Sequence, residues 1–336
     1  MIHAGTHKTA SSYIQSRMAA NASALAAAGV VLRYPGSRAA KHKPLAVALA
    51  RQRWPSWRRF LRELPADGPL VLLSAEHFAQ PLARRICLQP FVELLAAEGF
   101  GLHVLVFLRD QPDYINARYV HSVRRLYHHM GFEAYVAEQL AQRNHIYNYN
   151  SLFAELVGDA AVSCTFLPYG SCFGDPFDRM LDSLGCDRPE AGWRPADPCK
   201  GNVQPGCQGV WLAQAIGERL EQLGVEGPSL VKAGRVMRRI AEQQGWQDDR
   251  YCGFDPDGAT AVEAHYAVAN DAFARRVWGC SWRDRVPAVS MQRRRFDPAP
   301  AGPQRQQLEA LLEQALVDLA AQNPRLKRIL NKSERP

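Results

Sequence analysis

The sequence predicts an α/β protein with a central, mainly parallel sheet, followed by a mostly helical C-terminal part. Up to Cys186, short apolar runs alternate with segments of helical periodicity, as in successive βα units. One run, Gly101–Leu108, is almost continuously apolar, which is typical of a strand buried on both faces of a parallel sheet. After Cys186 the strand signals stop and helical periodicity continues. We therefore expect an α/β core over residues 1–190 and a helical extension over residues 191–336 that completes the same domain.

The expected elements begin with a short strand over Ile2–Ala4 and a helix over Ser12–Ala28, which Gly29 ends. Further strands are expected over 30–34, 69–74, 101–108 and 161–167. Further helices are expected over 41–64, 82–98, 112–128, 132–142, 149–157, 175–184, 207–223, 228–244, 259–277 and 304–321. A basic tail follows Pro324.

Composition limits the classes of function. The 336 residues carry a formal net charge of +8, which favours an anionic ligand without identifying it. The eight cysteines form no Cys-x-x-Cys pair and do not cluster with histidines, so we expect no metal site and the reduced thiols of a cytoplasmic protein. No apolar run approaches the ~20 residues of a membrane span. The first residues already form a strand and a loop, so no signal peptide is expected.

The most informative segment is the loop after the first strand, which reads Gly-Thr-His-Lys-Thr-Ala-Ser-Ser over residues 5–12. A strand, a loop of small residues and a helix start direct backbone N–H groups and a helix dipole at a phosphate. Lys8 adds a mobile positive charge. Three hydroxyl donors accompany it, from Thr9, Ser11 and Ser12. The loop is not a Walker A motif, because His7 precedes the lysine where that motif requires glycine. The structural alternative is an ordinary strand-to-helix turn capped by Ser11 or Ser12.

A second segment carries a charge at the end of a buried strand. The Gly101–Leu108 run is followed by Arg109 and then by a turn and a helix start, with Pro112 near the first turn. Ligands of open α/β sheets bind outside the carboxyl ends of the strands, where Arg109 is expected to lie. The alternative is an arginine that forms a salt bridge at the end of a strand.

The loop resembles the 5′-phosphosulfate loop of sulfotransferases that use 3′-phosphoadenosine-5′-phosphosulfate (PAPS). In bacterial members this loop reads approximately Gly-Thr-His-Lys-Thr-Gly-Thr-Thr. The first five positions match here, as Gly5, Thr6, His7, Lys8 and Thr9. The next three, Ala10, Ser11 and Ser12, are conservative departures. Ala10 is expected to forbid the φ > 0 conformation that glycine would allow. The resemblance covers roughly residues 1–190 and implies a P-loop-like three-layer fold with PAPS as the co-substrate.

The resemblance also implies residues for the rest of the nucleotide. The family's 3′-phosphate motif is a strand that ends in arginine, which Arg109 matches, with a serine eight residues later. Ala117 occupies that serine position, and Asn116 is the alternative donor. Residues 199–205 resemble a Lys-Gly-Arg-x-x-Pro loop that closes over the 3′-phosphate; the matching positions are Lys200, Gly201 and Pro205. A plain turn is the equal alternative for this segment.

Tyr13 stands where animal cytosolic sulfotransferases place an adenine-stacking tryptophan. The resemblance therefore predicts that Tyr13 packs near the adenine base. The alternative is an aromatic side chain that the helix buries in the core.

Sulfuryl transfer needs a base for the acceptor proton and a cation for the leaving phosphate oxygen. The resemblance implies that Lys8 stabilises the leaving oxygen. For the base we expect Glu76, in the segment Ser74–Phe78 after a buried strand, with His42 as the second choice. His77 is expected to face away if the strand alternates through this point. The structural alternatives are an acid at a helix N-terminus for Glu76 and a solvated side chain for His42.

The acceptor is the least predictable part. Five arginines between residues 51 and 62 are interleaved with Trp54 and Trp57, a pattern that suits a glycan or an anionic small molecule. The alternative is a solvated helix face with the tryptophans packed inward. No recognisable nucleic-acid fold is present. The resemblance predicts a PAPS-dependent sulfotransferase whose extension over 191–336 contributes to the acceptor site. A nucleotide kinase and a non-catalytic nucleotide- or polyanion-binding protein are the alternatives.

Overall fold

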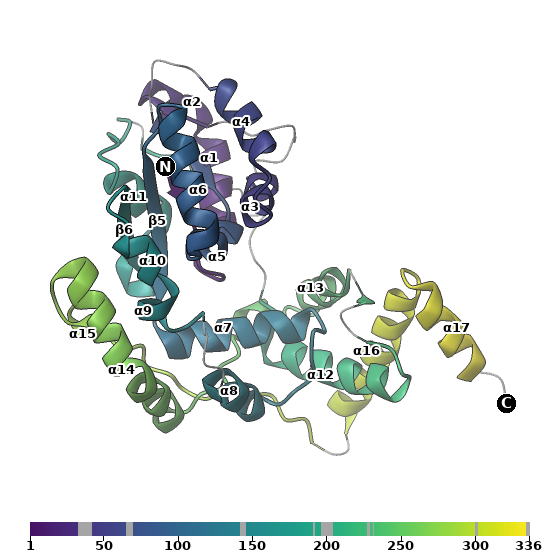
Figure 1. Cartoon of the computed structure of the whole chain (residues 1–336). Helices are drawn as coiled ribbons and strands as arrows, with labels where there is room; N and C mark the ends of the chain where they lie inside the picture. The colour runs from purple at the N-terminus through teal and green to yellow at the C-terminus, as the bar shows by residue number, and fades with distance from the viewer. Residues whose placement is uncertain are drawn as a thin grey trace. The chain divides into compact units, whose positions relative to one another are not determined.

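The computed structural model describes residues 1–32, 42–64, 70–141, 146–190, 192–195, 204–226, 229–230, 232–299 and 302–333 (Figure 1). Its architecture is α/β, with a four-stranded parallel sheet and a high helix content, as the sequence predicts. Tertiary contacts divide the chain into two compact units. The first contains Met1–Gln111, Asn144–Asn202 and Ala264–Ala288, and the second contains Pro112–Arg143, Val203–Glu263 and Val289–Pro336. The units therefore do not meet at a single boundary near residue 190. Pro112–Arg143 belongs to the second unit although it precedes this residue, and Ala264–Ala288 belongs to the first unit although it follows it.

The sheet of the first unit has the order β4-β1-β5-β6, and all of its strands are parallel. The strands are β1 (Ile2–His3), β4 (Leu73–Ser74), β5 (Leu102–Arg109) and β6 (Val162–Tyr169). In the register, His3 lies opposite both Ser74 and Leu105. The short strands β2 (Val30–Val31) and β3 (Leu70–Val71) form a separate parallel pair. The strand expected over 69–74 is thus split, because its first half pairs with β2 and its second half with β1.

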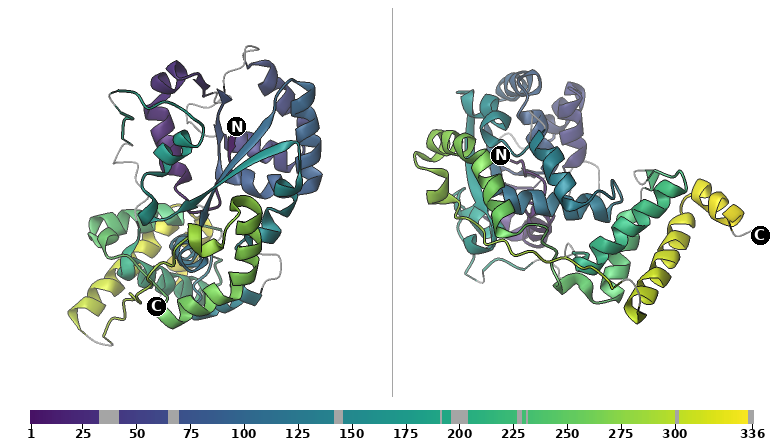
Figure 2. Two further views of the ribbon diagram at one scale, coloured as in Figure 1. Left: turned by 90° about the vertical axis from the view of Figure 1, so that its left-hand side faces the viewer. Right: turned by 90° about the horizontal axis from the view of Figure 1, so that it is seen from below.

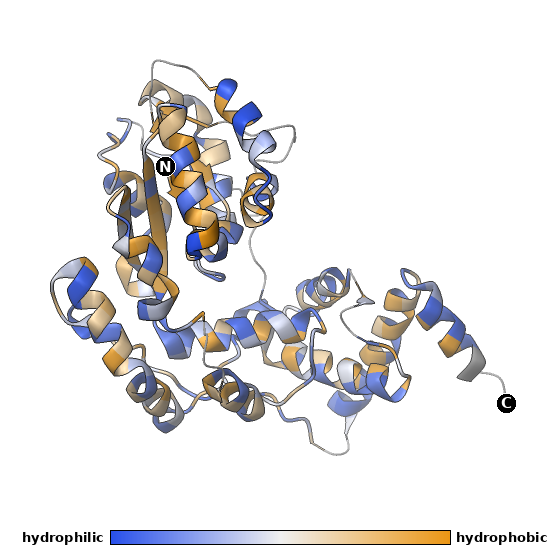
Figure 3. Ribbon diagram, in the orientation of Figure 1, coloured by the Kyte–Doolittle hydropathy of each residue, from blue (hydrophilic) through white to orange (hydrophobic). Residues whose placement is uncertain are grey.

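Helices cover both faces of the sheet. On one face lie α1 (Ser11–Ala20), α2 (Ala22–Ala27) and α11 (Pro176–Asp182). Their apolar side chains form one core with those of β5, including Ile14, Leu105, Phe107 and Phe177. Figure 2 (left) shows the long strands between α1, in purple, and α6 (Arg85–Ala97), in blue. The strand β5 is hydrophobic along most of its length, as Figure 3 shows, because both of its faces are covered.

The other face carries α4 (Trp54–Arg62) and α6, where the Trp57 and Phe91 rings lie 4.5 Å apart. Trp57 is 1% exposed, whereas the neighbouring Arg58 and Arg59 are exposed. Trp57 therefore packs inward as in the structural alternative for this stretch, whereas Trp54 is only half-buried and the arginines lie on the exposed face of α4. Preceding α4 is α3 (Lys43–Ala50), so the helix expected over 41–64 is two helices, and Gln52 between them has φ 52°.

Asn21 divides the helix expected over Ser12–Ala28 into α1 and α2. Its side-chain Nδ2 donates to Arg17 O at 2.8 Å and to Arg194 O at 2.9 Å, and Arg194 N donates to its Oδ1 at 2.7 Å. The buried side chain of Asn21 thus hydrogen-bonds to the backbone of two segments, and the regular helix is interrupted at this residue. Periodicity alone does not reveal this break, because the partner at residue 194 is remote in sequence.

Further short elements of the first unit are η1 (Glu76–Phe78), α5 (Ala79–Leu82), α9 (Tyr149–Leu152), α10 (Ala154–Gly158), η2 (Ser171–Phe173) and α15 (Trp282–Arg285). The long helix α14 (Pro256–Trp278) supplies Asn270, whose amide exchanges hydrogen bonds of 2.7 and 2.9 Å with that of Gln111. Both side chains are buried. This pair fixes α14 to the residue that begins α7 (Gln111–Arg124).

In the described part of the second unit, helices are joined by irregular segments, and the one β-type pairing is an isolated bridge between Cys252 and Arg294. Its helices include α8 (Phe132–Ala141), α12 (Gly206–Gln222), α13 (Ala233–Gln243), η5 (Trp246–Asp248), α16 (Pro303–Ala320) and α17 (Pro324–Ser333). The segment expected as a basic tail is thus a helix. Asn323 Oδ1 caps it by accepting from two backbone N–H groups, and Leu326 is fully buried. Over the described residues, no helix combines the length and apolar character needed to cross a membrane.

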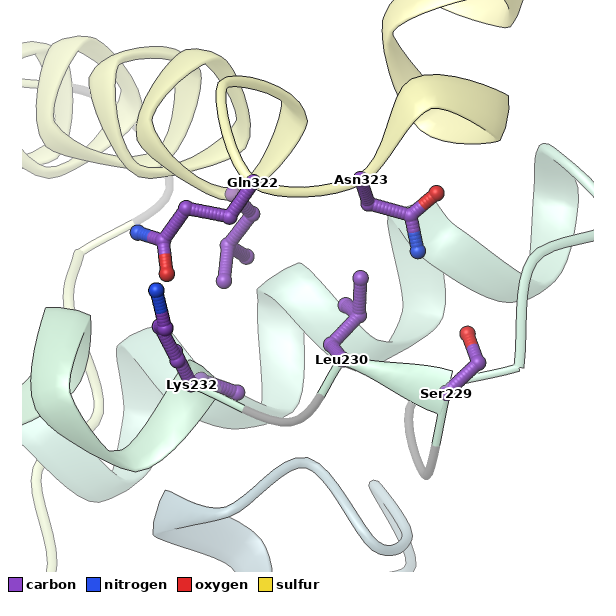
Figure 4. Close-up of a pocket in the computed structure, with 7 residues that line it drawn as sticks. Ser229, Leu230, Lys232, Gln322 and Asn323 are labelled. Carbon is purple, nitrogen blue, oxygen red and sulfur yellow. The ribbon is translucent and has the colours of Figure 1, made fainter.

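A small pocket of about 90 Å³ lies in the second unit between residues 229–233 and the turn from α16 to α17 (Figure 4). Lys232 and Gln322 point toward one another across it, and Leu230 and Leu319 add apolar walls. Its small volume and single charged side chain give it none of the convergent groups of a catalytic site.

Candidate functional site

The candidate site lies at the edge of the sheet where β1, β4 and β5 end. These strands are adjacent and parallel, so the residues that follow them emerge at one edge. The loop after β1 contains Lys8, η1 after β4 begins with Glu76, and β5 ends at Arg109. The structure therefore brings together three residues that the sequence places in three separate motifs. Residues 5–10 are called the anion loop below.

Two threonines hold the anion loop in shape. Thr6 Oγ1 donates to Phe107 O of β5 at 2.9 Å, and Thr9 Oγ1 donates to Thr6 O at 2.6 Å. Both side chains are buried. The Thr9 hydroxyl therefore serves the loop itself instead of supplying the ligand donor expected from the sequence.

Two residues of the anion loop have left-handed backbone conformations. Lys8 has φ 69°, and Ala10 has φ 59° and ψ 16°. The expectation that Ala10 would forbid φ > 0 is wrong: the alanine adopts that conformation, at an intrinsic energy of roughly 1–2 kcal/mol. Alternation of left-handed and other residues turns successive N–H groups toward one side, a geometry that binds anions.

The N-terminus of α1 has no side-chain cap. Ala10 occupies the cap position, and the first helical hydrogen bond runs from Ile14 N to Ala10 O at 2.9 Å. The N–H groups of the first turn consequently lack intrahelical acceptors. The alternative of a turn capped by Ser11 or Ser12 is thus excluded. Ser12 is exposed, whereas Ser11 is only 6% exposed and its Oγ has no hydrogen-bond partner among the described residues.

Gly5 lies close to the side chains of the loop and of the first turn of α1. A Cβ there would lie 2.2 Å from Ser11 Oγ, 3.4 Å from Thr9 Oγ1 and 3.6 Å from His3 Nε2. His3 Nε2 is likewise buried without a partner in the described part of the chain. Glycine thus lets two unpartnered polar atoms approach the start of the loop, where an oxygen of a bound anion would complete their hydrogen bonds.

Arg109 supports the anion loop directly. Its Nη1 donates to Lys8 O at 3.0 Å, and its guanidinium lies 5.6 Å from the centre of the Tyr169 ring. The carbonyl of a left-handed residue is thus held by a cation at the end of β5. A role for Arg109 at a 3′-phosphate remains an expectation, and the contact with Lys8 O is the function that the structure gives it.

The other expected contacts to the 3′-phosphate have different outcomes. Asn116 is engaged within the second unit: its Nδ2 donates to Tyr251 O at 3.1 Å, and its Oδ1 accepts from Gly253 N at 2.9 Å. The side-chain amide of Asn116, the alternative donor to the missing serine at Ala117, is thus hydrogen-bonded to backbone groups. Lys200 and Gly201 lie outside the described residues.

Glu76 forms an ion pair with His7 of the anion loop. Glu76 Oε2 lies 3.4 Å from His7 Nδ1, and the two side chains are 37% and 36% exposed. The hydrogen bond from His7 lowers the pKa of Glu76 to about 2 against the opposing effect of burial. The charges of His77 and Lys8 act in the same direction. Glu76 is therefore ionised at neutral pH, the state that a general base requires.

His77 and His42 are both placed differently from what the sequence predicts. His77 does not face away, because the chain turns into η1 after Ser74, and its ring centre lies 6.1 Å from that of His7. Burial lowers the pKa of His77, and the charge of Lys43 adds to this effect. His42 is completely buried, and its Nδ1 accepts a hydrogen bond of 2.9 Å from Ser74 N. The solvated alternative for His42 is wrong, and its position favours a role in holding β4.

Tyr13 belongs to a polar network that the sequence did not reveal. Its hydroxyl donates to Asp175 and accepts from Arg17 Nη1 at 2.7 Å. Arg17 is 6% exposed and pairs with Asp175 at 2.9 Å and Asp178 at 3.0 Å. Asp175 also caps α11 by accepting from Phe177 N. Its position before a proline is a signal for a helix start, but nothing in the sequence links it to Arg17.

Among the described residues, no three or more histidine, cysteine, aspartate or glutamate side chains are grouped so that they could hold a metal ion. Comparison with protein-family models, curated proteins and solved structures found no match to this chain.

Replacing Ala10 with glycine should stabilise the protein. The substitution removes the left-handed strain at this position, and the greater freedom of glycine in the unfolded chain offsets part of the gain. The free energy of unfolding should rise by roughly 0.5–1 kcal/mol in urea denaturation. Ala267→Gly is the matched control, because this exposed residue lies within α14 and its replacement should destabilise by a similar amount. Destabilisation by Ala10→Gly would contradict the left-handed conformation.

Acid should destabilise the protein through His3. Burial lowers the pKa of this histidine to about 4, from 6.5 in an exposed side chain. Below pH 6.5 the unfolded chain therefore binds a proton that the folded state does not, and stability falls as the pH decreases toward 4, by up to about 1.4 kcal/mol per pH unit. Denaturation midpoints of the wild type and His3→Asn across pH 4–8 measure the effect. His77, His103 and His128 titrate in both proteins, so only the His3 contribution survives in the difference, and identical pH profiles would refute it.

Proposed function

We propose that this chain is a PAPS-dependent sulfotransferase that transfers a sulfuryl group to a hydroxyl or amine of an acceptor. One observation carries the proposal: a glycine-containing anion loop and an uncapped helix N-terminus adjoin an ionised carboxylate at the same edge of a parallel sheet. The loop supplies groups for a phosphosulfate, and Glu76 supplies a base.

The anion loop has donors suited to the 5′-phosphosulfate. The N–H groups of the first turn of α1 have no side-chain cap, and the Ser11 hydroxyl next to Gly5 has no hydrogen-bond partner among the described residues. Lys8 provides the positive charge that stabilises the leaving phosphate oxygen as the bond to sulfur breaks. Arg109 holds the carbonyl of Lys8 and is the residue proposed to contact the 3′-phosphate. In this role Arg109 would couple recognition of the 3′-phosphate to the conformation of the anion loop.

Glu76 is the proposed general base. The acceptor hydroxyl gives its proton to this carboxylate, its oxygen forms the new bond to sulfur, and the bond from sulfur to the 5′-phosphate oxygen breaks. The buried position of His42 favours Glu76 over His42 for this step.

The proposed acceptor is a glycan or a small anionic metabolite. This part rests on the exposed arginines of α4, Arg58, Arg59 and Arg62. Of the two tryptophans in this segment, Trp57 is buried and cannot stack on a sugar ring.

Nucleotide affinity tests the proposal. Calorimetry should show that 3′-phosphoadenosine 5′-phosphate binds roughly 10–100-fold more tightly than adenosine 5′-phosphate, because a charge-assisted contact contributes on the order of 1.5–3 kcal/mol. Lys8→Met should weaken both nucleotides, and Lys232→Met in the pocket of the second unit should weaken neither. Equal affinity for the two nucleotides would contradict the role of Arg109. Preference for ATP with magnesium would favour a kinase, and no nucleotide binding would exclude the family.

Turnover tests the base. The rate of 3′-phosphoadenosine 5′-phosphate release from PAPS, measured with the best acceptor from a panel of glycans and phenols, should fall roughly 10²–10⁴-fold in Glu76→Gln. Glu93→Gln, an exposed position on α6, is the matched control and should keep the wild-type rate. Full activity of Glu76→Gln would show that the base lies elsewhere.

A further inference from the structure

His7 belongs to two groups of side chains at once. It lies in the anion loop next to Lys8, ahead of the uncapped N-terminus of α1. Its ring also reaches the neighbouring loop, where Nδ1 lies 3.4 Å from Glu76 Oε2. The contact crosses between two adjacent parallel strands, because His3 and Ser74 are paired in the register and both loops leave from these positions. His7 therefore connects the proposed donor site to the proposed base.

Both partners of this ion pair are accessible. About a third of each side chain is exposed, so a bound anion can compete for the imidazole without unfolding the loop. An exposed ion pair of this kind contributes little to stability, so a multiply charged ligand in the same place can replace it.

The charged groups that act on Glu76 are all basic. The anion loop contributes His7 and Lys8, and η1 itself contributes His77. The helix α3 packs on η1 and contributes Lys43, which acts on His77. Two further elements pack on η1. The helix α5 reads Ala-Gln-Pro-Leu and adds no charge, and β1 adds His3, whose pKa is lowered to about 4 by burial. With His7 drawn away, Glu76 still lies near the Lys8 ammonium and stays ionised, but it no longer has its closest partner.

We propose that His7 is shared between Glu76 and the co-substrate: it pairs with Glu76 in the nucleotide-free protein and moves to the phosphosulfate when the donor binds. The inference rests on the proposed function. Release of the carboxylate then makes the base available in the donor complex. The acceptor proton passes to Glu76, the acceptor oxygen bonds to sulfur, and the electron pair of the broken sulfur–oxygen bond stays on the phosphate beside Lys8. Donor binding thereby controls the readiness of the base.

A double-mutant cycle tests this sharing without any acceptor. The affinity of the full chain for 3′-phosphoadenosine 5′-phosphate is measured by calorimetry for the wild type, Glu76→Gln, His7→Gln and the double variant. Glu76→Gln should bind the nucleotide roughly two- to fivefold more tightly, because His7 is no longer divided between two anions. His7→Gln should weaken binding by a similar factor. In the His7→Gln background, Glu76→Gln should have little further effect.

His77→Gln separates the specific pair from a general change of charge. In this background Glu76→Gln should still tighten binding, because His7 remains. A gain that persists undiminished in the His7→Gln background, or no gain in the wild-type background, would overturn the sharing of His7 and leave the proposed function intact. Failure of all variants and the wild type to bind the nucleotide would overturn the proposed function instead. Thermal melts of each variant show that a changed affinity does not reflect unfolding.

Discussion

Parallel pairing of β1 between β4 and β5 is the constraint on which the candidate site depends. The strand contains only Ile2 and His3, yet it is paired on both sides, so the loops that follow three strands meet at one edge. The chain then turns into α1, and a side chain at Gly5 would require the Ser11 hydroxyl to move. Geometry of the sheet thus decides where the anion loop lies.

Buried polar groups beneath this edge stabilise the arrangement. His3 Nδ1 shares a hydrogen bond of 2.8 Å with Ser74 Oγ, and Gln15 Nε2 of α1 donates to Ser74 O at 3.2 Å. His42, before α3, accepts from Ser74 N. One serine therefore joins two strands and two helical segments two residues before Glu76. These hydrogen bonds hold the end of β4, from which the chain continues into η1 and Glu76.

Most of the polar side chains in and beside the anion loop already have partners within the protein. Backbone carbonyl oxygens accept hydrogen bonds from Thr6, Thr9 and Arg109. Arg17 forms ion pairs with Asp175 and Asp178. The first turn of α1 is left without side-chain caps. Binding of an anion is favoured there because its charge meets N–H groups and a helix dipole that the protein itself does not neutralise.

The sequence by itself determined the alternation of strands and helices, the loop of small residues before α1 and the carboxylate after β4, because periodicity and loop chemistry are local. Tertiary structure decided the rest. Ala10 is left-handed because the ends of its loop are held by β1 and α1, and His42 is buried because α3 packs on η1. The Arg17 network and the splitting of the strand over 69–74 join residues far apart in sequence. No local pattern encodes such pairings, because they become favourable only when the folded chain places both partners in contact.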